Sequence, residues 1–306
     1  MILTVTLNAA LDVTYRVPAL VPGATHRASP AGVRAGGKGV NVARVLHALG
    51  HDPVVTGFAG GDTGRAIRAD LAAAGIREAF VEPAAAARRT VTVVSEQDGA
   101  ATAFNEPGPR LSIEDWTWFT DRFHELASRA DVVVLSGSLP PGLPDHAYAQ
   151  LLGATTAPAI LDTSGPPLLE GVAAGPRVVK PNADEVAVTG LADPLGAARR
   201  LRARGAGAVV ASCGADGLLA VTADGCWRAA APEQVGGNPT GAGDACVAAL
   251  AAGLAAGMPW PELLADAAAL AAAAVACPLA GDVDLPTYRR LAPLAEVEEL
   301  DADPDR

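Results

Sequence analysis

Asp131-Val132-Val133-Val134-Leu135 is the first of several short runs that indicate the fold class of this 306-residue chain. It is short, apolar and rich in β-branched valine, and similar runs follow at 159–162, 177–179 and 208–212, with helical patterns between them. Apolar strands that alternate with helices are typical of a mostly parallel sheet covered by helices on both faces. The sequence therefore predicts an α/β fold.

The N-terminal third extends this pattern and adds a second feature. Ile2–Leu7 is another short apolar run, which predicts a buried strand of the same sheet. Segments 12–35 and 88–105 instead mix alternating patterns with turn residues, which predicts strands of a small exposed sheet. Although these two segments are far apart in the chain, we expect them to come together in one small sheet that forms a lid over the main sheet.

The C-terminal third contains two Ala-rich stretches, 242–256 and 260–275, that predict helices. Pro259, Pro261, Glu262 and Asp266 interrupt the apolar pattern. No membrane span is therefore expected, since a span needs about 20 strongly apolar residues. The acidic tail at 296–306 is expected to be frayed and flexible. With no internal repeat and no long linker, we expect a single domain over residues 1–306.

The composition limits the possible partners. The net charge is −11, and a nucleic-acid binder would usually show a basic face, which is not evident here. An acidic protein that binds an anion must gather its few cations at one place. The N-terminus lacks a signal-peptide pattern, and the four cysteines show no metal-binding spacing. We therefore expect a cytoplasmic protein with free thiols. The cysteines are Cys213, Cys226, Cys246 and Cys277.

A glycine-rich loop, Gly236-Gly237-Asn238-Pro239-Thr240-Gly241-Ala242-Gly243-Asp244, leads directly into the first of these helices. Amides at a helix N-terminus are unpaired and lie at the positive end of the dipole, so they bind anions such as phosphate. The same dipole favours ionised Asp244, which we expect to be a carboxylate at neutral pH. A carboxylate beside an anion hole suits phosphoryl transfer. The loop is equally compatible with an ordinary capped helix.

A second glycine-rich loop, Arg34-Ala35-Gly36-Gly37-Lys38-Gly39-Val40-Asn41, opens another predicted helix. Residues 32–38 nearly match a P-loop, but Gly39 stands where a P-loop needs Ser or Thr to hold Mg²⁺. An alternative is sugar binding, because Asn41 can donate and accept hydrogen bonds with hydroxyl groups. A tight helix start without a ligand is the third possibility.

Together with two further motifs, these loops resemble the ribokinase/PfkB family of sugar kinases. The segment Ala35–Arg44 is similar to the family's N-terminal signature and Pro239–Asp244 to its C-terminal one. Lys180-Pro181-Asn182-Ala183-Asp184-Glu185 resembles its N-x-x-E element, and Ser212–Gly217 its nucleotide-binding turn. Three further segments resemble one branch of the family, the 1-phosphofructokinase/tagatose-6-phosphate kinase branch. They are Thr6–Asp12, Asn105–Pro109 and Leu135–Pro140.

The resemblance implies a ribokinase-like three-layer α/β/α sandwich with a small β-sheet lid, an ATP- and Mg²⁺-dependent reaction, and a homodimer formed through the lid. It also implies a set of site residues. Asp244 would be the general base, and Gly241, Ala242 and Gly243 the anion hole. Asp12, Gly36, Gly37 and Asn41 would hold the sugar hydroxyls. Asn182 and Glu185 would organise Mg²⁺ through water, while Lys180, Asn182, Ser212, Gly214, Gly217 and Cys277 would lie along ATP.

The distribution of cations indicates an acceptor that already carries a phosphate. Arg27, Lys38 and Arg89 lie on the segments assigned to the lid and the sugar site, and the arginine fork suits phosphate. Ser138 could add a hydroxyl contact, whereas Arg88 is expected to be solvated. Each cation alone could equally be a solvated lid charge. The branch often has Asn two residues after the arginine, where this chain has Val91.

The leading hypothesis is therefore a kinase that converts fructose 1-phosphate to fructose 1,6-bisphosphate. Tagatose 6-phosphate and fructose 6-phosphate remain open as alternative acceptors, because the sequence does not fix the position of the phosphate. An alternative from another class is a nucleotide-binding regulator that uses residues 32–38 as a P-loop.

Overall fold

The computed structural model describes residues 1–186, 190–191 and 193–300, in two sheets. The larger sheet has ten strands in the order β14-β13-β12-β11-β10-β9-β8-β1-β4-β5. In that order they are Val297–Leu300, Cys226–Ala229, Leu218–Val221, Val209–Ser212, Val178–Val179, Ala159–Asp162, Val132–Ser136, Ile2–Thr6, Val54–Gly57 and Arg77–Glu78. The strands from β11 to β5 are parallel, and the β12–β14 edge is antiparallel.

Strand β8 shows why these runs are continuously apolar. Val133 and Leu135 belong to a core on one face of the sheet, and Val132 and Val134 to a core on the other. Successive side chains of a strand point to opposite faces, so a strand covered on both sides buries all of them. Each burial of this kind contributes about 1.5–3 kcal/mol.

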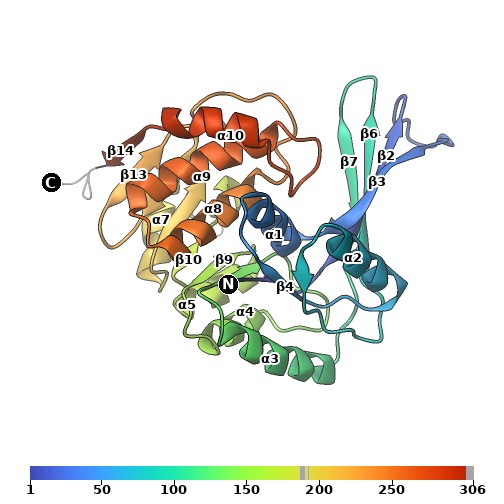
Figure 1. The fold of residues 1–306 in the computed structure, drawn as a ribbon, viewed down its shortest axis with the longest axis horizontal. Coiled ribbons are helices and arrows are strands. Elements are labelled where there is room, and N and C mark those ends of the chain that lie inside the picture. Colours follow the sequence, from blue (N-terminus) through green and yellow to red (C-terminus); the bar gives the residue numbers. More distant parts are fainter. Residues whose placement is uncertain (187–189, 192, 301–306) are drawn as a thin grey trace.

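Helices cover both faces of the large sheet (Figure 1). One layer contains α1 (Lys38–Ala48), α8 (Ala242–Ala256) and α9 (Trp260–Val275), with α10 (Leu285–Leu291) packed on α9. The other contains α3 (Ile113–Ala127), α4 (Ala147–Gly153), α5 (Pro166–Ala173) and α7 (Pro194–Ala203). The predicted three-layer α/β/α sandwich with a mostly parallel sheet is confirmed. Helix α2 (Gly61–Ala73) packs beside α1 under the second sheet, and α6 (Ala183–Val186) is a single turn.

The second sheet is the predicted lid and extends away from the main body (Figure 1). Its order is β3-β2-β6-β7, with bounds Ser29–Gly36, Ala10–Val17, Arg88–Ser95 and Ala101–Asn105. Two rows of side chains cross all four strands in register. A polar row runs Arg34, Asp12, Thr90, Asn105, and the adjacent apolar row runs Val33, Val13, Val91, Phe104. Neighbouring rows face opposite sides. We call the face that carries the polar row the polar face of the lid, and the apolar row lies on the other face.

The expectation of a frayed tail is wrong for its first part. Val297–Leu300 forms β14, which pairs with β13 at the edge of the large sheet. Val297 packs against the core on one face and Leu300 against the core on the other, which explains why the strand stays attached. The rest of the predicted flexible segment, 301–306, lies outside the described residues.

Both Ala-rich helices have the predicted bounds. Within the described residues, no helix combines the length and the apolar character that crossing a bilayer requires. The small alanine side chains of α8 and α9 allow these two helices to pack closely against each other and against the sheet.

Candidate active site

A cavity of about 950 Å³ lies at the carboxyl ends of β9, β10 and β11, under the polar face of the lid. This edge of a parallel sheet is where ligands usually bind. The cavity brings together most of the predicted site residues. Those that line it are Asp12, Gly37, Lys38, Asn41, Lys180, Asn182, Ser212, Gly214, Gly217, Gly241, Ala242, Gly243 and Asp244.

The Gly241 loop presents the N-terminus of α8 to this cavity. Gly241 has a φ of +95°, and a Cβ there would lie 2.8 Å from the Ala280 Cα, so both conformation and space require glycine. The predicted anion hole needs one correction, because the Ala242 amide already donates to the Pro239 carbonyl at 3.2 Å. The amides of Gly243 and Asp244 follow in the first turn, where a helix provides no acceptor. The Lys180 ammonium lies beside Gly243 and adds positive charge.

Asp244 is buried in the first turn of α8 and accepts a hydrogen bond of 2.8 Å from Asn41 Nδ2 on α1. Burial and the charge of Asp162 raise the pKa of Asp244 to about 7, against the lowering effect of the Asn41 hydrogen bond. The expectation that Asp244 is a carboxylate at neutral pH needs adjustment, because burial and Asp162 raise its pKa towards neutrality. A carboxylate that titrates near neutral pH is well suited to act as a general base.

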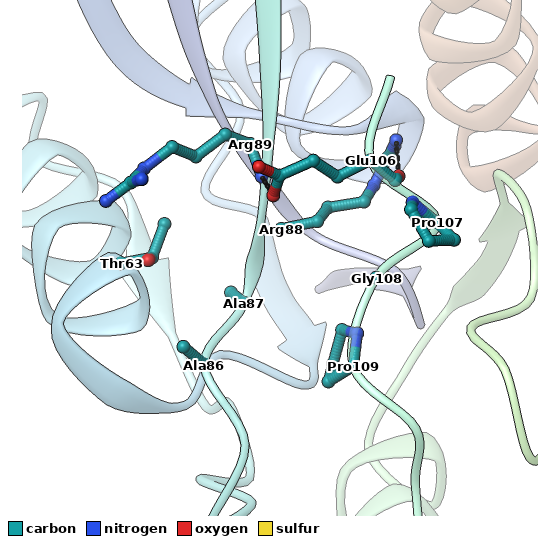
Figure 2. Close-up of a pocket in the computed structure, with 9 residues that line it drawn as sticks. All are labelled: Thr63, Ala86, Ala87, Arg88, Arg89, Glu106, Pro107, Gly108 and Pro109. Atoms are coloured by element: carbon teal, nitrogen blue, oxygen red, sulfur yellow. Dashed lines mark hydrogen bonds between the residues drawn. The ribbon is translucent and has the colours of Figure 1, made fainter. Parts of the chain in front are cut away.

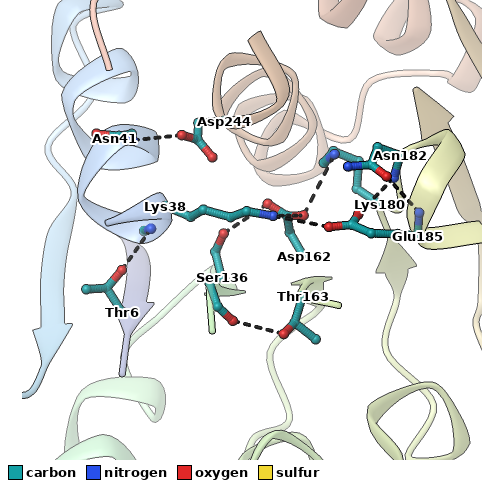
Figure 3. A network of polar contacts seen from close by, with 12 residues as sticks. Thr6, Lys38, Asn41, Ser136, Asp162, Thr163, Lys180, Asn182, Glu185 and Asp244 are labelled. Carbon is teal, nitrogen blue, oxygen red and sulfur yellow. Dashed lines mark hydrogen bonds and ion pairs between the residues drawn. The ribbon is translucent and has the colours of Figure 1, made fainter. Parts of the chain in front are cut away.

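Asp162, at the end of β9, is the centre of the polar network in Figure 3. Only 1% exposed, it accepts hydrogen bonds of 3.1 Å from Lys38 Nζ and from Ser136 Oγ, and lies 3.7 Å from Lys180 Nζ. Burial raises its pKa, but the two ammonium groups outweigh that effect and leave the pKa below its usual value. Sequence reasoning missed Asp162, although a lone acid at the carboxyl end of a buried strand was a usable signal.

The Asn182 and Glu185 pair has a clear local role. The backbone N–H of Asn182 donates to Glu185 Oε2 at 2.9 Å, and the backbone N–H of Glu185 donates to Asn182 Oδ1 at 2.7 Å. This reciprocal arrangement caps α6. Glu185 Oε1 also lies 3.6 Å from Lys38 Nζ. The motif therefore fixes a carboxylate opposite Asp162, with the Lys38 ammonium between the two (Figure 3).

The lid supplies the opposite wall. Asp12, Thr90 and Asn105 of its polar row line the cavity. Gly36 lies directly under Asp12, because a Cβ at that position would overlap the Asp12 carboxylate. Burial raises the pKa of Asp12 to about 6, although the Thr90 hydroxyl and nearby arginines lower it.

The two neighbouring arginines of β6 point in opposite directions, and the main cavity is lined by Arg88 and not by Arg89, the arginine that the sequence analysis placed there. Arg89 is exposed and points towards Thr63, outside the main cavity (Figure 2). Arg88 lines the main cavity, and its Nε donates to the Asn8 carbonyl at 3.1 Å. Val91 belongs to the apolar row on the same face as Arg89, so it takes no part in the cavity.

Ser138 and Glu185 line a smaller polar cavity of about 200 Å³ that shares Lys38 and Arg88 with the main one. Arg27 is exposed in the β2–β3 connection and lines none of the cavities described here. Cys277 also lies outside the main cavity, although α9 borders it through Ala268, Ala271, Ala272 and Val275. These apolar side chains line the same cavity as Ser212, Gly214 and Gly217.

The P-loop alternative is wrong. Gly32 lies within strand β3, paired with Thr14, so residues 32–36 form a strand and not a phosphate-binding loop. The Lys38 ammonium is held by Asp162 and Glu185. Burial lowers its pKa, but these two carboxylates and Asp244 outweigh that effect and raise the pKa above its usual value.

Comparison with known proteins agrees with this geometry. Residues 4–287 match the pfkB family carbohydrate kinase. The chain is 40% identical to a 1-phosphofructokinase from Xanthomonas campestris pv. campestris over 267 residues, or 82% of this chain and 83% of that protein. It is 37% identical to one from Rhodobacter capsulatus over 306 residues, or 96% and 95%. The phosphofructokinase-2 from Escherichia coli in complex with fructose-6-phosphate superposes with a TM-score of 0.87 at 31% identity, over 95% of this chain and 99% of that one. The chain therefore belongs to the pfkB family of carbohydrate kinases, which transfer a phosphoryl group to an alcohol.

Proposed function

We propose that this kinase transfers the γ-phosphoryl group of ATP to fructose 1-phosphate and forms fructose 1,6-bisphosphate. The observation that carries the proposal is the small polar cavity beside the sugar site, which Arg88, Lys38 and Ser138 line together with Glu185. Two cations and a hydroxyl suit a phosphate group on the acceptor. The two relatives named 1-phosphofructokinase support this choice of acceptor.

The acceptor would lie between the lid and α1. Asp12 and Asn41 would hold sugar hydroxyls, with Gly36 and Gly37 allowing close approach, and Arg88 would bind the phosphate already present. The hydroxyl at the far end of the sugar would then face Asp244 and the amides of Gly243 and Asp244. This arrangement places the proton acceptor and the anion hole on the same side of the reacting oxygen.

ATP would occupy the other half of the cavity. Its base would lie against the apolar side chains of α9, and its phosphates near Lys180, Asn182, Ser212, Gly214 and Gly217. For Mg²⁺ we propose Glu185 and Asn182, whose carboxylate and side-chain amide oxygens lie together at the start of α6. Mg²⁺ commonly uses one or two carboxylates plus water and substrate phosphates. Glu185, with Asn182 beside it, would hold the ion through water, and the ion would neutralise phosphate charge.

The chain's own residues would carry the transfer. Asp244 would take the proton from the 6-hydroxyl as that oxygen attacks the γ-phosphorus, and the bond from the γ-phosphorus to the oxygen that bridges it to the β-phosphate would break, which releases ADP. The first-turn amides of α8 and the Lys180 ammonium would stabilise the charge that develops on the phosphoryl oxygens. The lid would exclude water from the reacting groups.

We also infer a homodimer formed through the lid. Val33 and Phe104, at the ends of the apolar row, are 53% and 56% exposed. Exposed apolar side chains at both ends of this row favour coverage by a partner. The four free cysteines fit a reducing compartment such as the cytoplasm.

Fructose 6-phosphate and tagatose 6-phosphate are the alternative acceptors. The similar Escherichia coli structure in complex with fructose-6-phosphate supports fructose 6-phosphate as the stronger of these two alternatives. An ADP-release assay with fructose 1-phosphate, fructose 6-phosphate, tagatose 6-phosphate and fructose separates them. We expect the highest kcat/KM with fructose 1-phosphate. A higher value with either 6-phosphate would replace the proposed acceptor, and a higher value with fructose would remove the phosphate site.

A further inference from the structure

The connection between α9 and α10 passes over the active site, and three consecutive residues in it, Ala280–Asp282, contact three different parts of that site. We call these residues the 280–282 segment. Its first contact is with the anion hole, because the Ala280 Cα would lie 2.8 Å from a Cβ at Gly241. Ala280 also lines the main cavity. The backbone of this residue therefore limits where the N-terminus of α8 can lie.

The second contact is with the sugar side. Gly281 has a φ of +82°, and a Cβ there would lie 3.0 Å from Asn41 Oδ1 and 3.1 Å from Asn41 Cα. Gly281 thus packs directly on the side chain whose Nδ2 donates to Asp244. A shift of the segment would move Asn41 and the first turn of α1.

The third contact is with the lid. The Arg34 guanidinium donates two parallel hydrogen bonds to Asp282, Nη1 to Oδ2 at 2.9 Å and Nη2 to Oδ1 at 3.0 Å. Arg34 lies opposite Asp12 in the polar row of the lid and is 15% exposed, whereas Asp282 is 45% exposed. A half-exposed ion pair contributes little to stability, but a two-bond fork fixes geometry well.

We propose that the Arg34–Asp282 pair is a positioning contact that couples the lid over the acceptor to the anion hole that receives the nucleotide's phosphates. An acceptor that holds the lid strand β3 in place also holds Asp282. Ala280 and Gly281 are then held against Gly241 and Asn41. The acceptor should therefore tighten nucleotide binding, and by linkage the nucleotide should tighten acceptor binding by the same factor. This inference rests on the proposed placement of the acceptor under the lid.

The test measures the Kd of a non-hydrolysable ATP analogue with and without saturating fructose 1-phosphate, and in parallel with fructose 6-phosphate. We expect the acceptor to tighten the analogue about 5- to 20-fold in the wild type. Asp282→Asn and Arg34→Gln should reduce this factor to about 1–2, while the Kd of the analogue alone changes less than about twofold. The charge-exchanged pair Arg34→Asp with Asp282→Arg should restore part of the coupling.

Arg77→Gln is the matched control, because Arg77 makes a similar forked pair with Asp52 at the far edge of the sheet. It should leave the coupling factor unchanged. Full coupling in Asp282→Asn, or equal loss in the control, would overturn the inference. An acceptor that binds the wild type without tightening the analogue would also overturn it. If neither phosphosugar binds the wild type, the proposed function fails, and this inference fails with it.

Discussion

Helices α1 and α8 both begin at a glycine-rich loop, and their N-termini meet at the Asn41–Asp244 hydrogen bond. Their first turns carry opposite charges. Helix α8 carries Asp244, which the positive end of a helix dipole favours, whereas α1 carries Lys38, which it disfavours. Lys38 is held there by Asp162 and Glu185. The same local motif therefore serves two purposes, and the charge in the first turn distinguishes them.

This difference assigns separate kinetic roles to the two loops. The α8 loop offers amides and a proton acceptor, which we propose act on the reacting oxygen and determine kcat. The α1 loop and the lid offer side chains for hydroxyls and phosphate, which should determine the KM of the acceptor. Substitutions in each loop can break this separation or make it sharper.

The largest effect should follow from Asp244→Asn. The amide keeps a hydrogen-bonding oxygen for Asn41 but cannot take a proton, so kcat should fall by about 10²–10⁴. Steady-state kinetics and a thermal melt check this, and the acceptor KM and melting temperature should change little. Retention of more than a tenth of the wild-type kcat would contradict the assignment of the base.

A smaller effect should follow from Lys38→Met. Loss of one charged hydrogen-bond donor beside the acceptor should raise the acceptor KM by about 10- to 100-fold. Isothermal titration with an ATP analogue should show a nucleotide Kd within a few fold of the wild type. Loss of nucleotide binding with an unchanged acceptor KM would reverse the roles given to the two loops.

The pH profile should report the α8 carboxylate. Because the pKa of Asp244 is raised to about 7, its base form is lost as the pH falls through that value. The value of kcat/KM should then fall about tenfold per pH unit below 7. Asp12, with a pKa of about 6, is the competing candidate. In Asp12→Asn, the remaining kcat/KM should still fall as the pH drops below about 7. If this fall disappears in the variant, the titrating group is Asp12 and not Asp244.

The smallest effect concerns the edge strand, far from both loops. A chain that ends at Glu296 loses the packing of Val297 and Leu300, so the free energy of unfolding should fall by about 2 kcal/mol. Chemical denaturation measures this, and kcat should be unchanged. Equal stability of the shortened and complete chains would indicate that β14 is not attached in solution.

The sequence predicted those parts of the fold that depend on local patterns. The bounds of α8 and α9 follow from their composition and from the loops and prolines beside them, and the parallel strands follow from their apolar runs. The glycine loops located the site because anion binding at a helix N-terminus is a local property.

The parts that were missed depend on contacts between distant residues. Asp162 meets Lys38 across 124 residues, and no spacing motif connects them. Which of Arg88 and Arg89 faces the cavity depends on which face of the lid each β6 side chain points to. Because β6 is partly buried on both faces, its sequence lacks the alternation of apolar and polar residues that would show this. The pKa of Asp244 depends on burial and on Asp162, neither of which is visible from the loop alone.

The role proposed for Arg88 is to select an acceptor that already carries a phosphate. The decisive measurement is kcat/KM for fructose 1-phosphate and for fructose in the wild type, Arg88→Ala and Arg89→Ala. We predict that Arg88→Ala lowers the value for fructose 1-phosphate about 100-fold and leaves that for fructose within a few fold, because a charged, forked contact is lost. Arg89→Ala should resemble the wild type. An equal loss for both sugars in Arg88→Ala, or a phosphate-specific loss in Arg89→Ala, would contradict the account.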